Sequence, residues 1–259
     1  MVLNYKLTGT GEPVVLMHGL FGSLENLSTI QRHLEKQYQV INIDLTNHGS
    51  SPHSDEFTYQ SMANDVMDTM NHIGIDTFNL LGHSMGGKVA MTLALSAPSS
   101  VKKLICADIA PVVYNDRHTY IINALKSVDL ANLASRNDAD KQLSTSINEL
   151  GVRQFLLKSL VKDEATQQFR WRFNLAGLAQ NYSHIIGFDE SDAYEYRHFD
   201  APVLFIKGQN SDYITAEHRD VITSLFPNSQ AKIISNAGHW LHAEKPVAFN
   251  QIVERFLQS

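Results

Sequence analysis

Short runs of apolar residues alternate along this chain with longer segments in which apolar residues recur every three or four positions. In one such segment, apolar side chains step from Tyr59 to Ile73 at helical spacing, and Thr58 precedes it as an N-cap. Pro246–Leu257 repeats the pattern, with proline in the first helical turn and Val247 among the residues available for packing. The alternation predicts an α/β fold, a mostly parallel twisted sheet flanked by helices. The strands are expected at Val14–Met17, Val40–Asp44, Phe78–Leu81, Leu104–Ala107, Val203–Ile206 and Ala231–Ile234.

The alternation stops between residues 112 and 199. That stretch contains helical patterns, including Leu150–Val161 and Thr166–Asn181, and no convincing strand run. Strand patterning then resumes and completes the sheet, so we interpret residues 112–199 as a helical lid inserted into a core formed by residues 1–111 and 200–259. Ligands bind at the carboxyl ends of strands in parallel α/β sheets, so a lid there would shape a pocket and limit water.

Composition narrows the possible functions. The 259 residues include 21 basic and 27 acidic side chains, for a net charge of −6, which argues against a nucleic-acid partner. No stretch approaches the roughly 18 apolar residues of a membrane span, and the N-terminus lacks a leader pattern, so we expect a cytoplasmic location. Cys106 is the single cysteine, and its apolar neighbours indicate a buried strand residue.

The strongest chemical signal is the sequence Gly-His-Ser-Met-Gly-Gly at residues 82–87. It stands between a predicted strand and a predicted helix, the context of a nucleophile elbow, in which a serine projects from a sharp turn and glycines permit close backbone approach. We therefore predict that Ser84 is a nucleophile.

A serine hydroxyl needs a base to accept its proton. His239 follows the last predicted strand, where its loop reaches the carboxyl edge of the sheet. This position fits the chain order of hydrolases with such an elbow, in which serine comes first, the acid next and histidine last. We favour His239 over His242, which we expect to face outward or to bond locally. His83 points away from its neighbour Ser84, and His18 is better explained as a structural hydrogen-bonding residue.

The acid that orients the histidine has two candidates. In hydrolases with such an elbow, the acid usually lies in the loop that corresponds to the one after the strand Val203–Ile206. Here Ser211 occupies that position, and Asp212 comes one residue late. Asp108 ends the preceding strand on the same sheet edge, and an acid there could reach the same imidazole. We favour Asp108, with Asp212 as the alternative, and the other aspartate would only cap a loop or helix.

Hydrolysis through a serine also requires donors for an oxyanion. One is the backbone N–H of Met85, after the nucleophile, and we assign the other to Leu20 in the loop after an early strand, with Phe21 in reserve. We expect Phe21, Met85, Trp171 and Trp240 to form apolar walls of the substrate pocket.

These motifs resemble those of the α/β-hydrolase superfamily over essentially the whole chain, and in particular those of bacterial YbfF-type esterases. The resemblance rests on residues 18–23 (His-Gly-Leu-Phe-Gly-Ser), 44–51 (Asp-Leu-Thr-Asn-His-Gly-Ser-Ser), 82–88, 107–111 (Ala-Asp-Ile-Ala-Pro), 171–175 and 238–246. It implies an α/β-hydrolase fold and a hydrolase of carboxylic esters or acyl thioesters, including acyl-CoA, with the triad acid after the strand that precedes the lid, as at Asp108. One departure is Thr46, where an arginine is usual.

Other functions remain open at this point. Cofactor-free haloperoxidases and some lyases keep a Ser-His-Asp triad, and a ligand-binding homologue can retain one without catalysis. The chain shows no metal-binding cluster and no Gly-rich phosphate motif, so we expect neither a cofactor nor a metal and a small acyl ester or thioester as substrate. Fold alone does not specify which acyl group is preferred.

Overall fold

The computed structural model describes residues 1–188 and 198–259, and its core is one twisted sheet. Within these residues the sheet has seven strands in the order β1-β3-β2-β4-β5-β8-β9. β1 runs antiparallel to β3, and every other neighbouring pair is parallel. The strands are β1 (Tyr5–Thr8), β2 (Glu12–Met17), β3 (Tyr38–Ile43), β4 (Phe78–His83), β5 (Val101–Ala107), β8 (Val203–Gly208) and β9 (Ser229–Ile234).

All six strands expected from the sequence are present, so the predicted mostly parallel sheet is confirmed. β1 was not predicted. It has four residues, alternates apolar and polar side chains, and contains no fully buried residue, because it lies at the edge of the sheet. A strand this short leaves little periodic signal.

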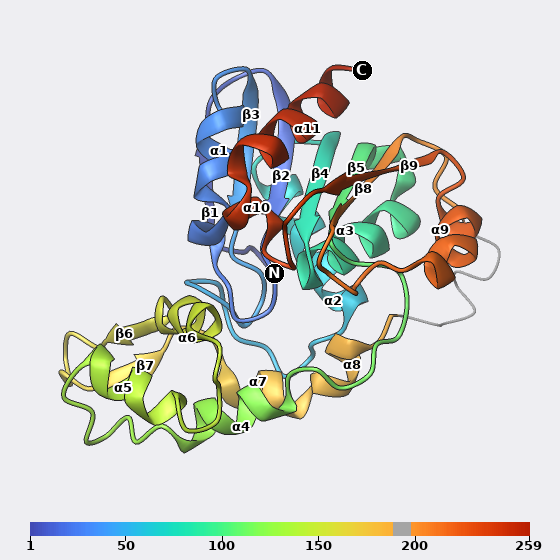
Figure 1. Cartoon of the computed structure of the whole chain (residues 1–259). Coiled ribbons are helices and arrows are strands. Elements are labelled where there is room, and N and C mark those ends of the chain that lie inside the picture. Colours follow the sequence, from blue (N-terminus) through green and yellow to red (C-terminus); the bar gives the residue numbers. More distant parts are fainter. Residues whose placement is uncertain (189–197) are drawn as a thin grey trace.

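Helices cover both faces of the sheet (Figure 1). Successive strand residues point to opposite faces. Val15 and Met17 pack with α2 and α3, whereas Val14 and Leu16 pack with α1 and α11. The helices of this core are α1 (Ser28–Leu34), α2 (Tyr59–His72), α3 (Met85–Ser96), α9 (Arg219–Leu225), α10 (Leu241–Glu244) and α11 (Pro246–Gln258), with short 3-10 turns at Leu24–Leu27, Pro98–Ser100 and Ala216–His218.

Two helices of the core begin where the sequence predicts. The Thr58 hydroxyl accepts a hydrogen bond from the backbone N–H of Ser61 at the start of α2, so the predicted cap is confirmed. α11 begins at Pro246 as expected and buries Phe249 and Val253. The expectation that Val247 packs in the core is wrong. Its side chain is 70% exposed because it lies off the stripe of α11 that faces the sheet.

The segment inserted between β5 and β8 is mainly helical, as predicted, and it also contains a two-stranded antiparallel hairpin that the sequence pattern did not reveal. The predicted helix Leu150–Val161 ends at Leu157. The predicted helix Thr166–Asn181 is helical only from Leu175, and its first part contains the strand Phe169–Trp171. Residues 189–197 of the predicted lid lie outside the described residues. The elements are α4 (Thr119–Ser127), α5 (Arg136–Leu143), α6 (Leu150–Leu157), β6 (Leu160–Lys162), β7 (Phe169–Trp171), α7 (Leu175–Gln180) and α8 (Tyr182–Ile186).

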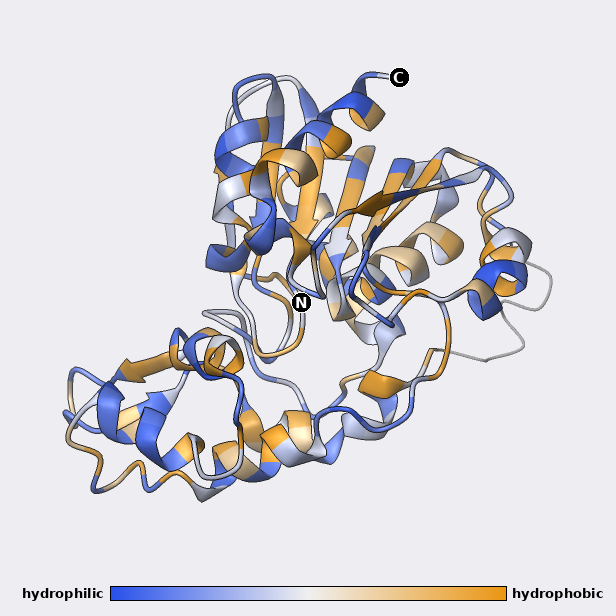
Figure 2. Ribbon diagram, viewed as in Figure 1, coloured by the Kyte–Doolittle hydropathy of each residue, from blue (hydrophilic) through white to orange (hydrophobic). Residues whose placement is uncertain are grey.

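The insertion lies across the end of the sheet at which the parallel strands terminate (Figure 1). Hydrophobic residues concentrate on the strands, while the flanking helices carry hydrophobic and hydrophilic residues on different sides (Figure 2). Because the insertion covers that end of the sheet, the loops that follow β2, β4, β5, β8 and β9 meet beneath it, which is where a ligand site is expected in such a sheet.

No helix in the described part of the chain is both long and apolar enough to cross a membrane.

Candidate active site

Ser84 stands on a sharp turn between β4 and α3. Its backbone has φ 52°, a left-handed conformation that is uncommon for a residue with a side chain. The turn is crowded: a Cβ on Gly82 would lie 2.1 Å from the carbonyl oxygen of Gly86, and one on Gly86 would lie 2.4 Å from the carbonyl oxygen of Met17. The glycines on both sides of Ser84 are therefore required by backbone approach, and the geometry is that of the predicted nucleophile elbow.

A chain of hydrogen bonds connects Ser84, His239 and Asp108. The Ser84 Oγ lies 2.9 Å from His239 Nε2, and His239 Nδ1 lies 2.8 Å from Asp108 Oδ2. With the proton on Nδ1, the imidazole donates to the carboxylate and its Nε2 can accept the serine proton. The structure thus brings together the three side chains that the sequence predicted as a triad.

Asp108 is fully buried and held by several donors. β5 pairs with both β4 and β8, so the residue after β5 lies between the ends of its neighbours. One carboxylate oxygen accepts the Gly208 N–H at 3.0 Å. The other accepts the Ser211 hydroxyl as well as His239. Three donors fix the orientation of this buried carboxylate, and its hydrogen bond to Nδ1 in turn orients the His239 ring.

Asp212 is placed differently. Its side chain is 73% exposed and pairs with Arg117, with 2.6 Å between Oδ1 and Nη1. That hydrogen bond lowers the pKa of Asp212. Asp212 therefore points away from His239, and Ser211 reaches the acid instead. Ser211 occupies the position at which the acid is usual and donates its hydroxyl to Asp108, a contact that no local sequence pattern predicts.

Two further residues hold His239 from either side, and sequence reasoning did not identify them. Tyr213 stacks on the His239 ring, with centroids 3.8 Å apart and planes 16° apart. His83 Nε2 donates to the backbone carbonyl of His239 at 2.8 Å. Burial, reinforced by the neighbouring His242 and His239, lowers the pKa of His83 well below the usual value, which keeps this ring neutral. Tyr213 and His83 lie 26 and 156 residues before His239 in the sequence, so neither contact produces a local sequence pattern.

His242 corrects a sequence expectation. We expected it to face outward or to bond locally, but it is buried and its ring lies against His83, with centroids 4.4 Å apart. Burial lowers the pKa of His242 to about 3. The short helix α10 turns it inward toward the core instead of toward solvent. His18 is as expected: it accepts the Leu45 N–H through Nε2 at 3.0 Å and lies within bonding distance of the Gly19 carbonyl.

The backbone donors proposed for an oxyanion border Ser84. Met85 is the first residue of α3, whose N-terminus carries a partial positive charge. The Phe21 N–H donates to His48 Nε2 at 3.1 Å and is therefore occupied. Among the described residues, no acceptor within the protein takes the Leu20 or the Met85 N–H. This pattern favours Leu20 over Phe21 as the second donor.

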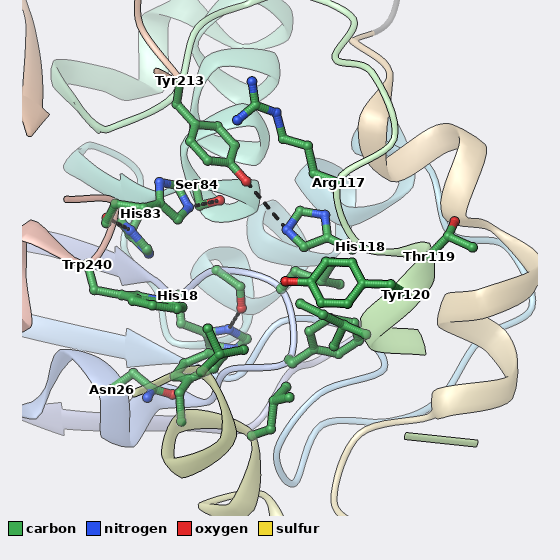
Figure 3. A pocket seen from close by; sticks show the side chains of 18 of the residues that line it. His18, Asn26, His83, Ser84, Arg117, His118, Thr119, Tyr120, Tyr213 and Trp240 are labelled. Carbon is green, nitrogen blue, oxygen red and sulfur yellow. Dashed lines mark hydrogen bonds between the residues drawn. The ribbon is translucent and has the colours of Figure 1, made fainter. Parts of the chain in front are cut away.

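A cavity of about 720 Å³ lies between the insertion and the core, and Ser84 opens into it (Figure 3). This volume is within the range of sites for small molecules. Phe21 and Trp240 line the cavity, as expected. Other apolar side chains on its wall come from both parts of the chain and include Leu20, Leu27, Ile121, Val152, Phe155 and Leu156.

Trp171 does not line this cavity, contrary to expectation. It is buried inside the insertion, stacked on Phe173 with centroids 5.6 Å apart, and Phe173 in turn contacts Phe21. Phe173 therefore separates Trp171 from the ligand space. At the polar side of the cavity, Tyr213 reaches toward His118, and the Arg117 guanidinium lies over the Tyr213 ring at 4.6 Å (Figure 3). Burial lowers the pKa of His118 to about 4 and raises that of Tyr213 to about 12, so both are neutral near pH 7.

Within the described residues, no group of three or more histidine, cysteine or acidic side chains is arranged to hold a metal ion. The chemistry that the site offers comes from Ser84, His239, Asp108 and the adjacent amides.

Comparisons with known proteins agree with this fold. The family model for the alpha/beta hydrolase fold matches residues 12–246. The chain is 42% identical over 246 residues to esterase YbfF from Escherichia coli (strain K12), covering 95% of this chain and 92% of that protein. It is 38% identical over 266 residues to the sn-1-specific diacylglycerol lipase ABHD11 of Mus musculus, covering 98% and 85%.

A solved structure, that of a marine microorganism esterase, superposes with a TM-score of 0.92 at 38% identity and covers 98% of this chain and 99% of that one. The family model, the two relatives and the solved structure each match this chain over nearly its full length. The chain therefore belongs to the α/β-hydrolase family, and it is a hydrolase of the esterase and lipase type.

Proposed function

We propose that this enzyme hydrolyses carboxylic esters and acyl thioesters of small or short acyl groups through an acyl-enzyme on Ser84. The observation that carries the proposal is the hydrogen-bond chain from Ser84 Oγ through His239 to the buried Asp108 carboxylate. A serine, a neutral imidazole and a buried carboxylate in this order form the arrangement that activates a hydroxyl for acyl transfer.

In the first half of the reaction, His239 Nε2 accepts the Ser84 proton while Oγ attacks the carbonyl carbon. The carbonyl oxygen becomes an oxyanion held by the Leu20 and Met85 amides. His239 then returns the proton to the leaving oxygen as the bond from the carbonyl carbon to that oxygen breaks. The alcohol departs, and the acyl group remains on Ser84.

In the second half, water gives a proton to His239 and attacks the acyl carbon. The bond from that carbon to Oγ breaks, Ser84 regains its proton, and the acid is released. Asp108 holds the Nδ1–H tautomer and stabilises the imidazolium in both halves. Thioesters, acyl-CoA among them, fit the same sequence because a thiol, with a pKa of about 8.5, leaves more readily than an alcohol.

The test is a set of initial rates for p-nitrophenyl esters and acyl-CoA thioesters of increasing chain length, with wild type and Ser84→Ala compared side by side. We expect turnover to depend on Ser84 and to be fastest for short acyl groups. Equal rates in wild type and Ser84→Ala would instead favour a lyase, a haloperoxidase or a binding protein that retains the triad.

A further inference from the structure

Ser84 lies at the junction of two spaces. One is the large cavity beneath the insertion, and the other is a recess of about 30 Å³ that also borders Leu20. The recess is open toward the large cavity, and its other sides are formed by α2, the start of α3 and the end of the insertion, through Tyr59, Met85, Lys88, Ile109, Tyr114 and Ile185. A substrate bound at Ser84 thus has a spacious side and a confined side.

The position of His239 determines whether the alcohol part or the acyl part of an ester lies in the large cavity. The leaving oxygen must lie within reach of His239 Nε2, because that atom returns the proton to it. Among the described residues, His239, His83 and Trp240 border the large cavity and do not border the recess. With the carbonyl oxygen directed at the Leu20 and Met85 amides, the leaving alcohol lies in the large cavity. The acyl substituent then points to the opposite side, into the recess.

The recess admits only a small group. A volume of about 30 Å³ is two to three times the 10–15 Å³ that a single water molecule needs, which corresponds to one or two carbon atoms. Its walls are braced by hydrogen bonds. Tyr59 donates its hydroxyl to the Ile185 carbonyl at 2.6 Å, and Tyr114 donates to the Tyr213 carbonyl at 2.6 Å. Tyr59 and Ile185 are buried, so neither wall is free to swing outward.

The hydrogen-bond donors of Lys88, at the floor of the recess, are all in use. Lys88 Nζ donates to the carbonyls of Val112 at 2.8 Å and Ile186 at 3.0 Å, and also to that of Gly187. An ammonium has three protons to donate, and three carbonyls accept them. Lys88 therefore has no donor left for a carboxylate. Arg117, the other cation that borders the recess, pairs with Asp212, so a neutral acyl group fits the recess better than an anionic one.

From this geometry, and resting on the proposed function, we infer that the recess is the acyl subsite and the large cavity the alcohol subsite. The substrates are then esters of a short neutral acid, acetic or propionic, with a bulky and largely apolar alcohol. This assignment names both parts of the substrate and their orientation at Ser84.

Two isomeric esters test the orientation in the wild-type enzyme. Octyl acetate and methyl nonanoate share one molecular formula and differ in which side of the ester carries the long chain. We expect kcat/KM for octyl acetate to exceed that for methyl nonanoate by at least about tenfold. A preference for methyl nonanoate, with hydrolysis still dependent on Ser84, overturns the subsite assignment and leaves the proposed function intact. Loss of Ser84 dependence for both esters overturns the proposed function and the assignment together.

A pair of variants tests the recess itself. Ile185→Ala enlarges it, so we expect the ratio of kcat/KM for p-nitrophenyl butyrate over p-nitrophenyl acetate to rise by about tenfold. The matched control is Val152→Ala, which enlarges the large cavity and leaves the recess as it is, so this ratio stays at the wild-type value. An unchanged ratio in folded Ile185→Ala, or an equal rise in Val152→Ala, contradicts the assignment.

Discussion

At the scale of single residues, the site depends most on the environment of Asp108. Its carboxylate accepts hydrogen bonds from Gly208, Ser211 and His239 and has no exposed surface. Like Ser84, it follows a strand with a positive φ, 53°. Such conformations cost on the order of 1–3 kcal/mol and persist where the surrounding structure imposes them. Each residue donates its backbone N–H to the last part of the neighbouring strand, Ser84 to Ala107 and Asp108 to Ile206, and both side chains bond to the same imidazole.

The first prediction separates the two candidate acids. Asp108→Asn places an amide where the carboxylate accepts the Nδ1 proton, so the productive tautomer of His239 is lost, and we expect kcat to fall by on the order of 10⁴. Asp212→Asn removes only an exposed ion pair with Arg117, and we expect a change of less than about threefold. Steady-state kinetics on both purified variants, with folding checked by circular dichroism, decides between them. A larger loss in Asp212→Asn would contradict the assignment of Asp108.

The second prediction concerns Ser211, which donates to the carboxylate oxygen that also binds His239. Ser211→Ala removes one hydrogen bond to a charged group, worth about 1.5–3 kcal/mol, and we expect kcat to fall by roughly tenfold to a hundredfold. Ser211→Thr keeps the hydroxyl and serves as the control, with kcat closer to wild type. Unchanged kcat in Ser211→Ala would show that the bond does not support Asp108.

Part of this site could be read from the sequence because its signals are local. Ser84 lies within a motif whose glycines the turn requires, and His239 follows a clear strand. Tyr213 and His83 could not be identified in this way, because stacking on His239 and donation to its carbonyl depend on how distant loops meet. Trp171 was assigned wrongly to the cavity wall for the same reason, since an aromatic residue in the insertion packs as readily inside it as toward the ligand.

At the scale of elements, α3 connects the nucleophile to the insertion. Ser84 precedes its first residue, and Lys88, one turn later, is bonded to carbonyls at both ends of the insertion, Val112 before α4 and Ile186 at the end of α8. Burial lowers the pKa of Lys88 to about 7, and no carboxylate pairs with it in the described residues. The same helix therefore carries the nucleophile and holds both stems of the insertion.

The third prediction follows from that connection. Lys88→Met keeps most of the length of the side chain and removes the donor from three half-buried carbonyls, at a cost of up to about 1–3 kcal/mol for an unsatisfied group. We expect a lower midpoint of thermal unfolding and faster proteolysis within residues 112–186. Lys126→Met, on an exposed position of α4, is the control and should leave both measurements near wild type. Equal stability and equal proteolysis in Lys88→Met would contradict a role in holding the insertion.

Helices and strands were predicted correctly where burial produces a regular pattern of apolar residues, and poorly where it does not. The central strands and α2 have continuous apolar runs or a helical stripe. The hairpin of β6 and β7 has three residues per strand, and the sequence around it also fits a helix. Short apolar runs are ambiguous between helix and strand, and in this segment the contacts inside the insertion decide the outcome.

At the scale of the whole molecule, folding keeps several histidines buried and neutral. Burial lowers the pKa of His48 and of His242 to about 3 and that of His118 to about 4. An unfolded histidine has a pKa of about 6.5, so below that pH the unfolded chain binds protons that the folded protein does not. The free energy of unfolding therefore decreases as pH falls from about 6.5 toward 3, and the stabilisation is complete above about 6.5.

The fourth prediction is that the midpoint of thermal unfolding falls steadily between pH 6.5 and pH 4, measured by circular dichroism at constant ionic strength. His242→Phe removes one buried titrating ring and should make that fall shallower. His184→Gln removes an exposed histidine and should not alter the slope. The same slope in wild type and His242→Phe would contradict this explanation of acid sensitivity.

The central claim about the whole enzyme is that one residue, Ser84, forms the covalent bond to the acyl group. A fluorophosphonate reacts with an activated serine, so mass spectrometry of the labelled protein, followed in time beside ester hydrolysis, tests it most directly. We predict one adduct per chain, located on Ser84, with hydrolysis lost in step with its formation and neither labelling nor hydrolysis in Ser84→Ala. An adduct on another residue, or ester hydrolysis that continues after Ser84 is fully modified, would contradict the account.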